Sequence, residues 1–122
     1  MTRRSVNLQA ANILPCANTA GLIYTMNIGV CKIDLRIPEN ETLKGKRMVI
    51  QSIISRVRDK FHVSIAEVEN GDKWQIATIG VCCVSNDNRH ANEMISRIVD
   101  YIETSRLDVE VLSCETEFIS VF

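Results

Sequence analysis

The sequence predicts an α+β domain in which two helices cover one face of a four-stranded antiparallel sheet. The central observation is Asn70-Gly71-Asp72, which separates two strand-like runs, because Asn-Gly in such a place is the strongest short-range hairpin signal. A segment with the period of an amphipathic helix flanks this hairpin on each side, and a further strand lies outside each helix. The predicted element order is therefore β-α-β-β-α-β.

Residues 27–37 form the predicted first strand. Apolar side chains alternate there with charged ones, with Ile33, Leu35 and Ile37 against Lys32, Asp34 and Arg36. This alternation gives the strand one buried and one wetter face. Ile28 and Val30 have the opposite parity, so the start of the strand is apolar on both faces or carries a bulge. Pro38 ends the strand because it cannot donate to a ladder.

The first helix is expected to begin after Thr42, a plausible N-cap. Its sheet-facing stripe consists of Leu43, Ile50, Ile53, Ile54, Val57 and Phe61. Arg47 falls close to this stripe, where an apolar residue is expected. Two interpretations stay open: a snorkelling arginine with its head in water, or an anion contact near the helix N-terminus.

The hairpin strands are predicted from His62 to Val68 and over residues 73–84. The second of these is apolar on both faces, so we expect it to be central and covered on both sides. Asn86 or Asp87 can cap the second helix, whose buried stripe consists of Ala91, Met94, Ile95, Ile98 and Ile102. A final strand is expected over residues 107–118.

This order is the split β-α-β unit of a ferredoxin-like two-layer sandwich. The topology determines which loops meet. The loop after the first strand shares one end of the sheet with the Asn70-Gly71 turn. The turn before the second helix shares the other end with the C-terminus of the first helix.

Length, net charge and cysteine content limit the classes of function that this chain can have. The 122 residues suit one domain, and a formal net charge of −1 argues against wholesale electrostatic capture of nucleic acid, although a local patch can act. The five cysteines are odd in number and contain no CxxC pair, so neither a metal site nor a disulfide framework is indicated. We expect reduced thiols in a cytoplasmic protein without a cofactor. No apolar run approaches the ~20 residues that span a membrane.

Residues 1–25 differ from the remainder of the chain. They carry Arg3 and Arg4 and no acidic residue, and their apolar residues are too scattered for a secretory signal. We interpret this segment as a flexible N-terminal extension, or as sequence upstream of a start at Met26. The ferredoxin-like domain is then expected over residues 26–122.

The domain resembles the YlxP family, small bacterial proteins of unassigned biochemical function. The resemblance rests on Ile37-Pro38, on the segments 42–47 (TLKGKR) and 61–68 (FHVSIAEV), on Trp74-Gln75 and on 84–87 (VSND). It implies a ferredoxin-like fold and, because the family's genes often lie among those of translation factors and ribosome-binding factor A, a role near RNA or the ribosome. The leader departs from the family pattern. So does Gly45, where a frequent Glu would complete a capping box with Thr42.

The first candidate site lies at the start of the first helix. It combines four cations and one aromatic side chain, namely Lys44, Lys46, Arg47, Lys73 and Trp74. Cations near a helix N-terminus suit phosphate, and a base can stack on tryptophan. The alternative is a solvated basic rim beside an ordinary strand tryptophan.

The second candidate site lies at the opposite end of the sheet. It consists of His62, Asn86, Asp87, Arg89 and His90. An imidazole beside a carboxylate can act as a base or as a pH switch. The alternative is that the polar residues before the second helix are ordinary caps. No nucleophile elbow or triad spacing is present.

Two classes of protein that share this topology, the acylphosphatases and the RNA-recognition motifs, are disfavoured. An acylphosphatase needs a glycine-rich phosphate loop after the first strand, and this chain has Pro38-Glu39-Asn40-Glu41-Thr42 there. An RNA-recognition motif needs exposed aromatic residues on its two central strands. The predicted central strands offer Cys, Gly, Ile and Thr instead.

Three hypotheses follow. The first is a non-enzymatic binding protein associated with RNA or a ribosomal subunit. The second is a homodimeric interaction module, because an uncovered apolar sheet face is a patch that monomers rarely expose. The third is a small enzyme or ligand sensor that uses His90 and Asp87.

Overall fold

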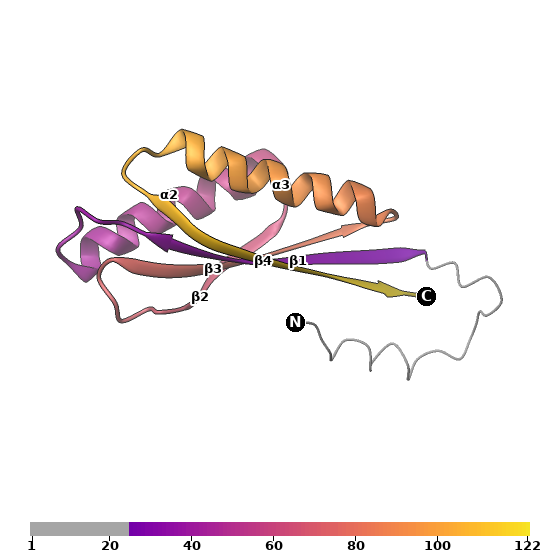
Figure 1. Cartoon of the computed structure of the whole chain (residues 1–122), viewed down its shortest axis with the longest axis horizontal. Coiled ribbons are helices and arrows are strands. Elements are labelled where there is room, and N and C mark those ends of the chain that lie inside the picture. The colour runs from indigo at the N-terminus through magenta and orange to yellow at the C-terminus, as the bar shows by residue number, and fades with distance from the viewer. Residues whose placement is uncertain (1–24) are drawn as a thin grey trace.

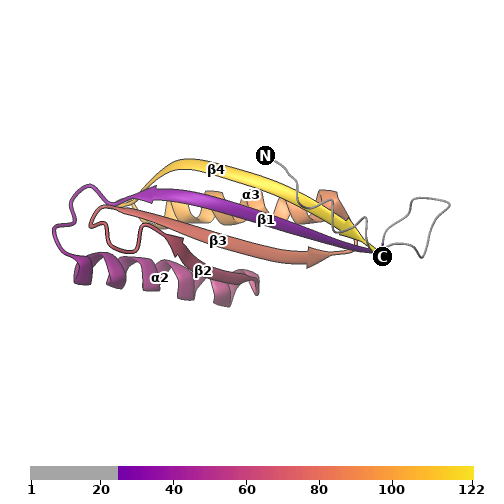
Figure 2. The same ribbon diagram turned by 90° about the horizontal axis from the view of Figure 1, so that it is seen from below.

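The computed structural model describes residues 25–122, so the predicted extension over residues 1–25 lies almost wholly outside the described part of the chain. The elements, in order, are β1 (Met26–Arg36), α2 (Leu43–Phe61), β2 (Ser64–Glu69), β3 (Ile76–Ser85), α3 (Asn88–Ser105) and β4 (Glu110–Val121). The four strands form one antiparallel sheet in the order β2-β3-β1-β4. Both helices lie on the same side of this sheet (Figures 1 and 2). The predicted ferredoxin-like sandwich is confirmed.

The core fills the space between the sheet and the two helices. Alternate residues of the central strands point into it, among them Ile33 and Leu35 of β1 and Ala77 and Ile79 of β3, all fully buried. The helices contribute the predicted apolar stripes: Ile50, Ile53, Ile54 and Val57 from α2, and Ala91, Ile95, Ile98 and Ile102 from α3. The core is therefore built from strand residues that recur at every second position and from helix residues that recur about every 3.6 positions.

Several predicted strand limits differ from the structure, and the starts at His62 and at residue 107 are wrong. His62 does not begin a strand, because it caps α2 in the left-handed conformation (φ 56°) and its amide donates to the Arg58 carbonyl. The last strand begins at Glu110 and not at residue 107. Leu107 lies in a turn with its side chain in solvent, where an ion pair between Arg106 and Asp108 at 2.7 Å holds the chain.

The predicted tight hairpin is also wrong in detail. Residues 70–75 form a longer loop, because β3 begins at Ile76 and not at residue 73. Asn70 has a positive φ of 63°, whereas Gly71 does not. A turn forms in which the Lys73 amide donates to the Asn70 carbonyl, and the Asn70 side chain donates to Thr78 Oγ1. Asn70 therefore makes the turn, as a residue that tolerates the left-handed region.

The loops meet as the topology predicts. At one end of the sheet, the Ile37 amide donates to the Gln75 carbonyl over 2.8 Å. The Asn40 side chain donates there to the Trp74 carbonyl over 2.6 Å. Gln75 returns two hydrogen bonds from its side-chain amide to the carbonyls of Pro38 and Asn40. These bonds hold the loop after β1 against the loop before β3.

The second face of the sheet is uncovered by any element of residues 25–122 (Figure 2). β3 is central in the sheet, as predicted, but it is covered on one side only. We call this uncovered side the open face. On β1 and β3 its residues are the even-numbered ones, because the odd-numbered ones point toward the helices.

Gly29 provides a test of packing between the sheet and α3. A Cβ added there would lie 3.1 Å from Ile95 Cδ1, 3.2 Å from Ala91 Cβ and 3.3 Å from a ring carbon of Phe118. We expect Gly29→Ala to lower the free energy of unfolding by about 1–2 kcal/mol, because three neighbours must move together. Gly71→Ala is the control, since nothing lies within 4 Å of its Cβ position. Urea unfolding measures both, and equal stability of the two variants would contradict this packing.

Candidate functional site

Lys46 is the most unusual residue of the first candidate site, because its side chain is completely buried. Lys46 occupies the stripe position between Leu43 and Ile50, on the sheet-facing side of α2. The predicted role of Lys46 as a surface anion contact therefore needs correction. The neighbouring Arg47 lies in solvent instead, and its anion contact stays a prediction.

The Lys46 ammonium is enclosed by acceptors from the hairpin. Nζ donates to the Asn70 carbonyl over 2.6 Å and to the Ile76 carbonyl over 3.2 Å. It also lies 3.1 Å from Oε2 of Glu67, although this oxygen accepts no well-directed hydrogen bond. A buried charge is tolerated only when it is paired in this way. Lys46 thus fastens the start of α2 to both ends of the loop between β2 and β3.

The remaining residues of the first candidate site are exposed. Thr42 caps α2 as predicted, and its hydroxyl accepts from the Gly45 amide over 2.9 Å. Lys44 and Arg47 follow on the outer surface of the first helical turns, and Lys73 and Trp74 stand in the loop before β3. The Trp74 side chain is 56% exposed. Asn40 joins the two segments, because its side-chain amide donates to the carbonyls of both Thr42 and Trp74.

The second candidate site is a helix cap. Asp87, and not Asn86, is the N-cap of α3, and its carboxylate accepts from the Arg89 amide over 3.0 Å. Ser85 Oγ accepts from the Asp87 amide and lies 3.3 Å from Nδ1 of His90. His62, Asn86, Arg89 and His90 are exposed. The capping interactions account for Ser85 and Asp87 without a catalytic role, and a function of His90 stays a prediction.

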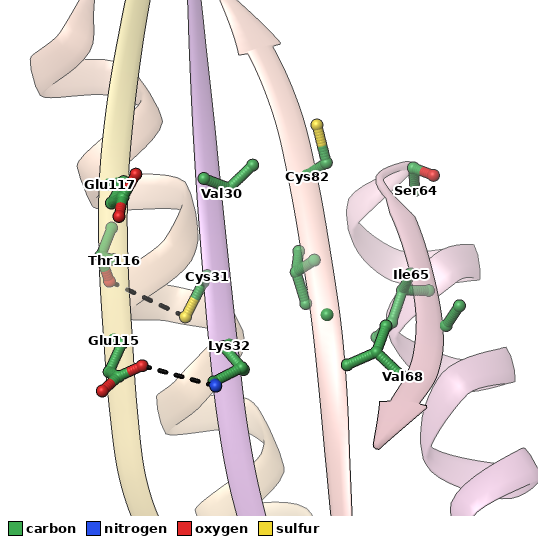
Figure 3. Close-up of a pocket in the computed structure, with 13 residues that line it drawn as sticks. Val30, Cys31, Lys32, Ser64, Ile65, Val68, Cys82, Glu115, Thr116 and Glu117 are labelled. Atoms are coloured by element: carbon green, nitrogen blue, oxygen red, sulfur yellow. Dashed lines mark hydrogen bonds and ion pairs between the residues drawn. The ribbon is translucent and has the colours of Figure 1, made fainter. Parts of the chain in front are cut away.

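A hollow that sequence analysis did not find lies on the open face (Figure 3). It has a volume of about 580 Å³ and is lined by residues of all four strands. Its floor contains small side chains in cross-strand pairs, with Ser64 opposite Cys82 and Ala66 opposite Gly80. Val68 forms one wall, since a Cβ on Gly80 would lie 3.1 Å from its Cγ1. The lack of bulk at these pairs makes the face concave.

The half of the open face nearest the Lys46 end is polar and internally paired. Lys32 lies between Glu69, at 3.7 Å, and Glu115, at 3.8 Å. Next to it, Asp34 accepts hydrogen bonds from the hydroxyls of Thr78 and Ser113. The hydrogen bond from Thr78, followed by that from Ser113, holds the pKa of the Asp34 carboxyl below its usual range against the opposing effect of burial. We call this region the polar half.

The other half of the open face is mainly apolar, and the carboxylate-bearing Glu117 of β4 lies opposite Val30 at its border with the polar half. Its residues pair across three strands: Val30 with Cys82, Ile28 with Val84 and Ile119, and Met26 with Val121. Val84 is 66% exposed. We call this region the apolar half. The open face of β1 and β3 carries no aromatic side chain, so the stacking platform of an RNA-recognition motif is missing there.

Residues 25–122 contain no group of three His, Cys, Asp or Glu side chains placed to hold a metal ion. Within the same range, neither helix is long and apolar enough to cross a membrane.

Comparison with known proteins identifies the family. A family model described as a protein of unknown function (DUF503) matches residues 28–116. The uncharacterized protein YlxP of Bacillus subtilis (strain 168) is 32% identical over 77 residues, which cover 63% of this chain and 84% of that protein. The chain belongs to the DUF503 family, and the resemblance to YlxP expected from the sequence is confirmed.

The buried ammonium makes a prediction about stability. Lys46→Met leaves two carbonyls without their donor and the Glu67 carboxylate without its cation, so we expect the free energy of unfolding to fall by about 3 kcal/mol. In the double variant Lys46→Met/Glu67→Met, at least about 1 kcal/mol should return, because the unpaired carboxylate is removed.

Lys44→Met is the matched control, since Lys44 is exposed two residues away and its loss should change stability by less than about 0.5 kcal/mol. Denaturant unfolding measures all three variants. If Lys46→Met and Lys44→Met lower the free energy of unfolding equally, the buried contacts of Lys46 do not contribute to stability.

Proposed function

We propose that this member of the DUF503 family is a non-enzymatic binding protein that docks other protein surfaces on its open sheet face, and that the occupant is a second copy of the chain. One observation carries the proposal. The open face presents a contiguous apolar half, drawn from β1, β3 and β4, that no element of residues 25–122 covers. Such a patch marks an interaction site in soluble proteins.

The size of the open face suits a modest interface. Strands spaced about 4.8 Å apart that rise about 3.3 Å per residue give four strands of this length a projected area of roughly 600 Å². Side-chain relief adds to this area. A standard protein interface buries about 800 Å² on each partner, so contact through the apolar half alone, about half of the face, gives a small interface of the size found in weak, concentration-dependent dimers.

Charge determines how two copies meet. The polar half carries more carboxylates than cations, with Asp34, Glu69, Glu110 and Glu115 against Lys32 and Arg36. Stacking two such halves would bring like charges together. A twofold axis through the apolar half avoids this, because it places the two polar halves at opposite ends of the dimer. Packing of two twisted sheets at about −30° is compatible with that arrangement.

The dimer is tested by a charge placed in the apolar half. We expect the wild-type chain to sediment as a dimer at high micromolar concentration, with little dependence on salt because the contact is apolar. Val84→Glu should weaken dimerisation by at least about tenfold, because a carboxylate would lose its water in the interface.

Met48→Glu is the matched control. Met48 lies on α2, on the opposite side of the molecule from the open face, and is 66% exposed, as Val84 is. The control variant should dimerise as the wild type does. A monomeric wild type at every concentration, or equal dimerisation of both variants, would overturn the proposal.

Association with RNA or a ribosomal subunit is our second candidate function, supported by the exposure of Trp74. Its indole stands in the same loop as Lys73, and the Asn40 bridge holds this loop beside the helix start that carries Lys44 and Arg47. An aromatic ring beside cations suits single-stranded nucleic acid. The burial of Lys46 leaves three cations in the site.

This second candidate predicts binding of bacterial small ribosomal subunits in a pelleting assay at low salt and release at high salt. Trp74→Ala should weaken binding by about 1–3 kcal/mol if a base stacks on the ring. Phe122→Ala is the aromatic control, because Phe122 is exposed at the opposite end of the sheet. No pelleting at low salt, or the same affinity in both variants, would exclude this interface.

A further inference from the structure

Two cysteines on neighbouring strands bring their sulfur atoms into contact. The Sγ atoms of Cys31 on β1 and Cys114 on β4 are 3.1 Å apart. Cys31 is only 4% exposed, whereas Cys114 is exposed to solvent. Thr116 Oγ1 lies 3.8 Å from the Cys31 sulfur and 3.9 Å from the Cys114 sulfur (Figure 3 shows the contact with Cys31). One thiol therefore faces solvent and the other lies directly behind it.

The strand register places both thiols on the helix side of the sheet. Cys31 is opposite Thr116, and Cys114 is opposite Ile33, so the two cysteines are diagonal neighbours on one face. A disulfide has a sulfur–sulfur distance of about 2.05 Å, so closure needs an approach of about 1 Å. Diagonal neighbours on adjacent strands are farther apart than directly opposite residues, so closure also needs a small movement of the β1 or β4 backbone. The β1–β4 pairing shifts register close by, after Asp34.

We propose that Cys31 and Cys114 form a reversible dithiol–disulfide pair that a hydroperoxide oxidises, with Cys114 reacting first and Cys31 resolving the product. In the first step, Cys114 attacks one peroxide oxygen, the O–O bond breaks, and the thiol proton leaves with the departing oxygen. With hydrogen peroxide the products are a sulfenic acid on Cys114 and one water.

In the second step, the Cys31 sulfur attacks the Cys114 sulfur and displaces the sulfenic hydroxyl. The Cys31 proton leaves with this hydroxyl as a second water, and the S–S bond forms. The two thiols together lose two electrons, and the peroxide accepts them. A dithiol reductant restores both thiols by thiol–disulfide exchange and is itself oxidised to a disulfide.

The environments of the two sulfurs assign their roles. Peroxide must reach the attacking sulfur, and only Cys114 of the pair is exposed. Burial, together with the hydrogen bond to Cys114, raises the pKa of the Cys31 thiol to about 12, which makes Cys31 less reactive toward peroxide than an exposed thiol. Its contact with Cys114 then places it beside the sulfenic acid as soon as that forms.

The chain contains its own reference cysteines. Cys82 is partly exposed on the open face, on the other side of the sheet from the pair. Cys83 is buried, and its burial raises the pKa of its thiol. Cys16 lies outside the described residues and is replaced in the test by Cys16→Ser. The register places both thiols on the helix side of the sheet, although Cys31 is also among the residues that line the hollow. The oxidation is argued from the contact between the two sulfurs and does not require the proposed docking function.

The test treats the full Cys16→Ser chain with limiting hydrogen peroxide, blocks the remaining thiols and maps the peptides without reduction. We expect a peptide that joins Cys31 to Cys114, lost on treatment with dithiothreitol, while Cys82 is alkylated in full. Cys114→Ser should leave Cys31 reduced. Cys31→Ser should stop the reaction at the sulfenic acid of Cys114, which dimedone traps.

Cys31→Ala accompanies Cys31→Ser, because a hydroxyl in the core can destabilise the fold, and circular dichroism identifies the folded variant to be used. The proposal is overturned if Cys114 is oxidised no faster than Cys82. It is also overturned if Cys114 is oxidised first but forms its disulfide with a cysteine other than Cys31.

Discussion

The structure depends on one constraint: two amphipathic helices are available for a four-stranded sheet that has two faces. Both helices pack on the same face, because each strand–helix–strand unit returns its chain on that side. The odd-numbered residues of β1 and β3 therefore enter the core, and the even-numbered ones are left on the open face. The hollow, its division into polar and apolar halves, and the proposed dimer all follow from this arrangement.

The buried ammonium of Lys46 shows where sequence analysis reaches its limit. Positions 46 and 47 both fit the helical spacing between Leu43 and Ile50, so periodicity alone does not decide which side chain enters the core. The choice is made by acceptors distant in sequence, the carbonyls of Asn70 and Ile76 and the carboxylate of Glu67. No local sequence pattern indicates these distant acceptors. Lys44 and Arg47, the exposed neighbours of Lys46, need no distant partner for their exposure, and their anion contacts stay a prediction.

The fold itself was predictable, since the two periodicities, the Thr42 cap and the interruption at Asn70 are local signals. The open-face hollow was not, because the small residues of β2 and β3 form a concave floor only once Ser64 is paired with Cys82 and Ala66 with Gly80. The contact between Cys31 and Cys114 likewise depends on the register of β1 with β4. The sequence therefore predicted which elements form, but not the strand register that brings distant residues into contact.

The most direct test of the open face as a docking surface is the alkylation rate of Cys82 as a function of protein concentration, in the reduced chain. Cys82 lines the hollow, whereas Cys114 lies on the helix side and serves as an internal reference in the same sample. Self-association through the open face predicts that Cys82 reacts more slowly relative to Cys114 as the concentration rises. A ratio of rates that stays constant up to high micromolar concentration would contradict it.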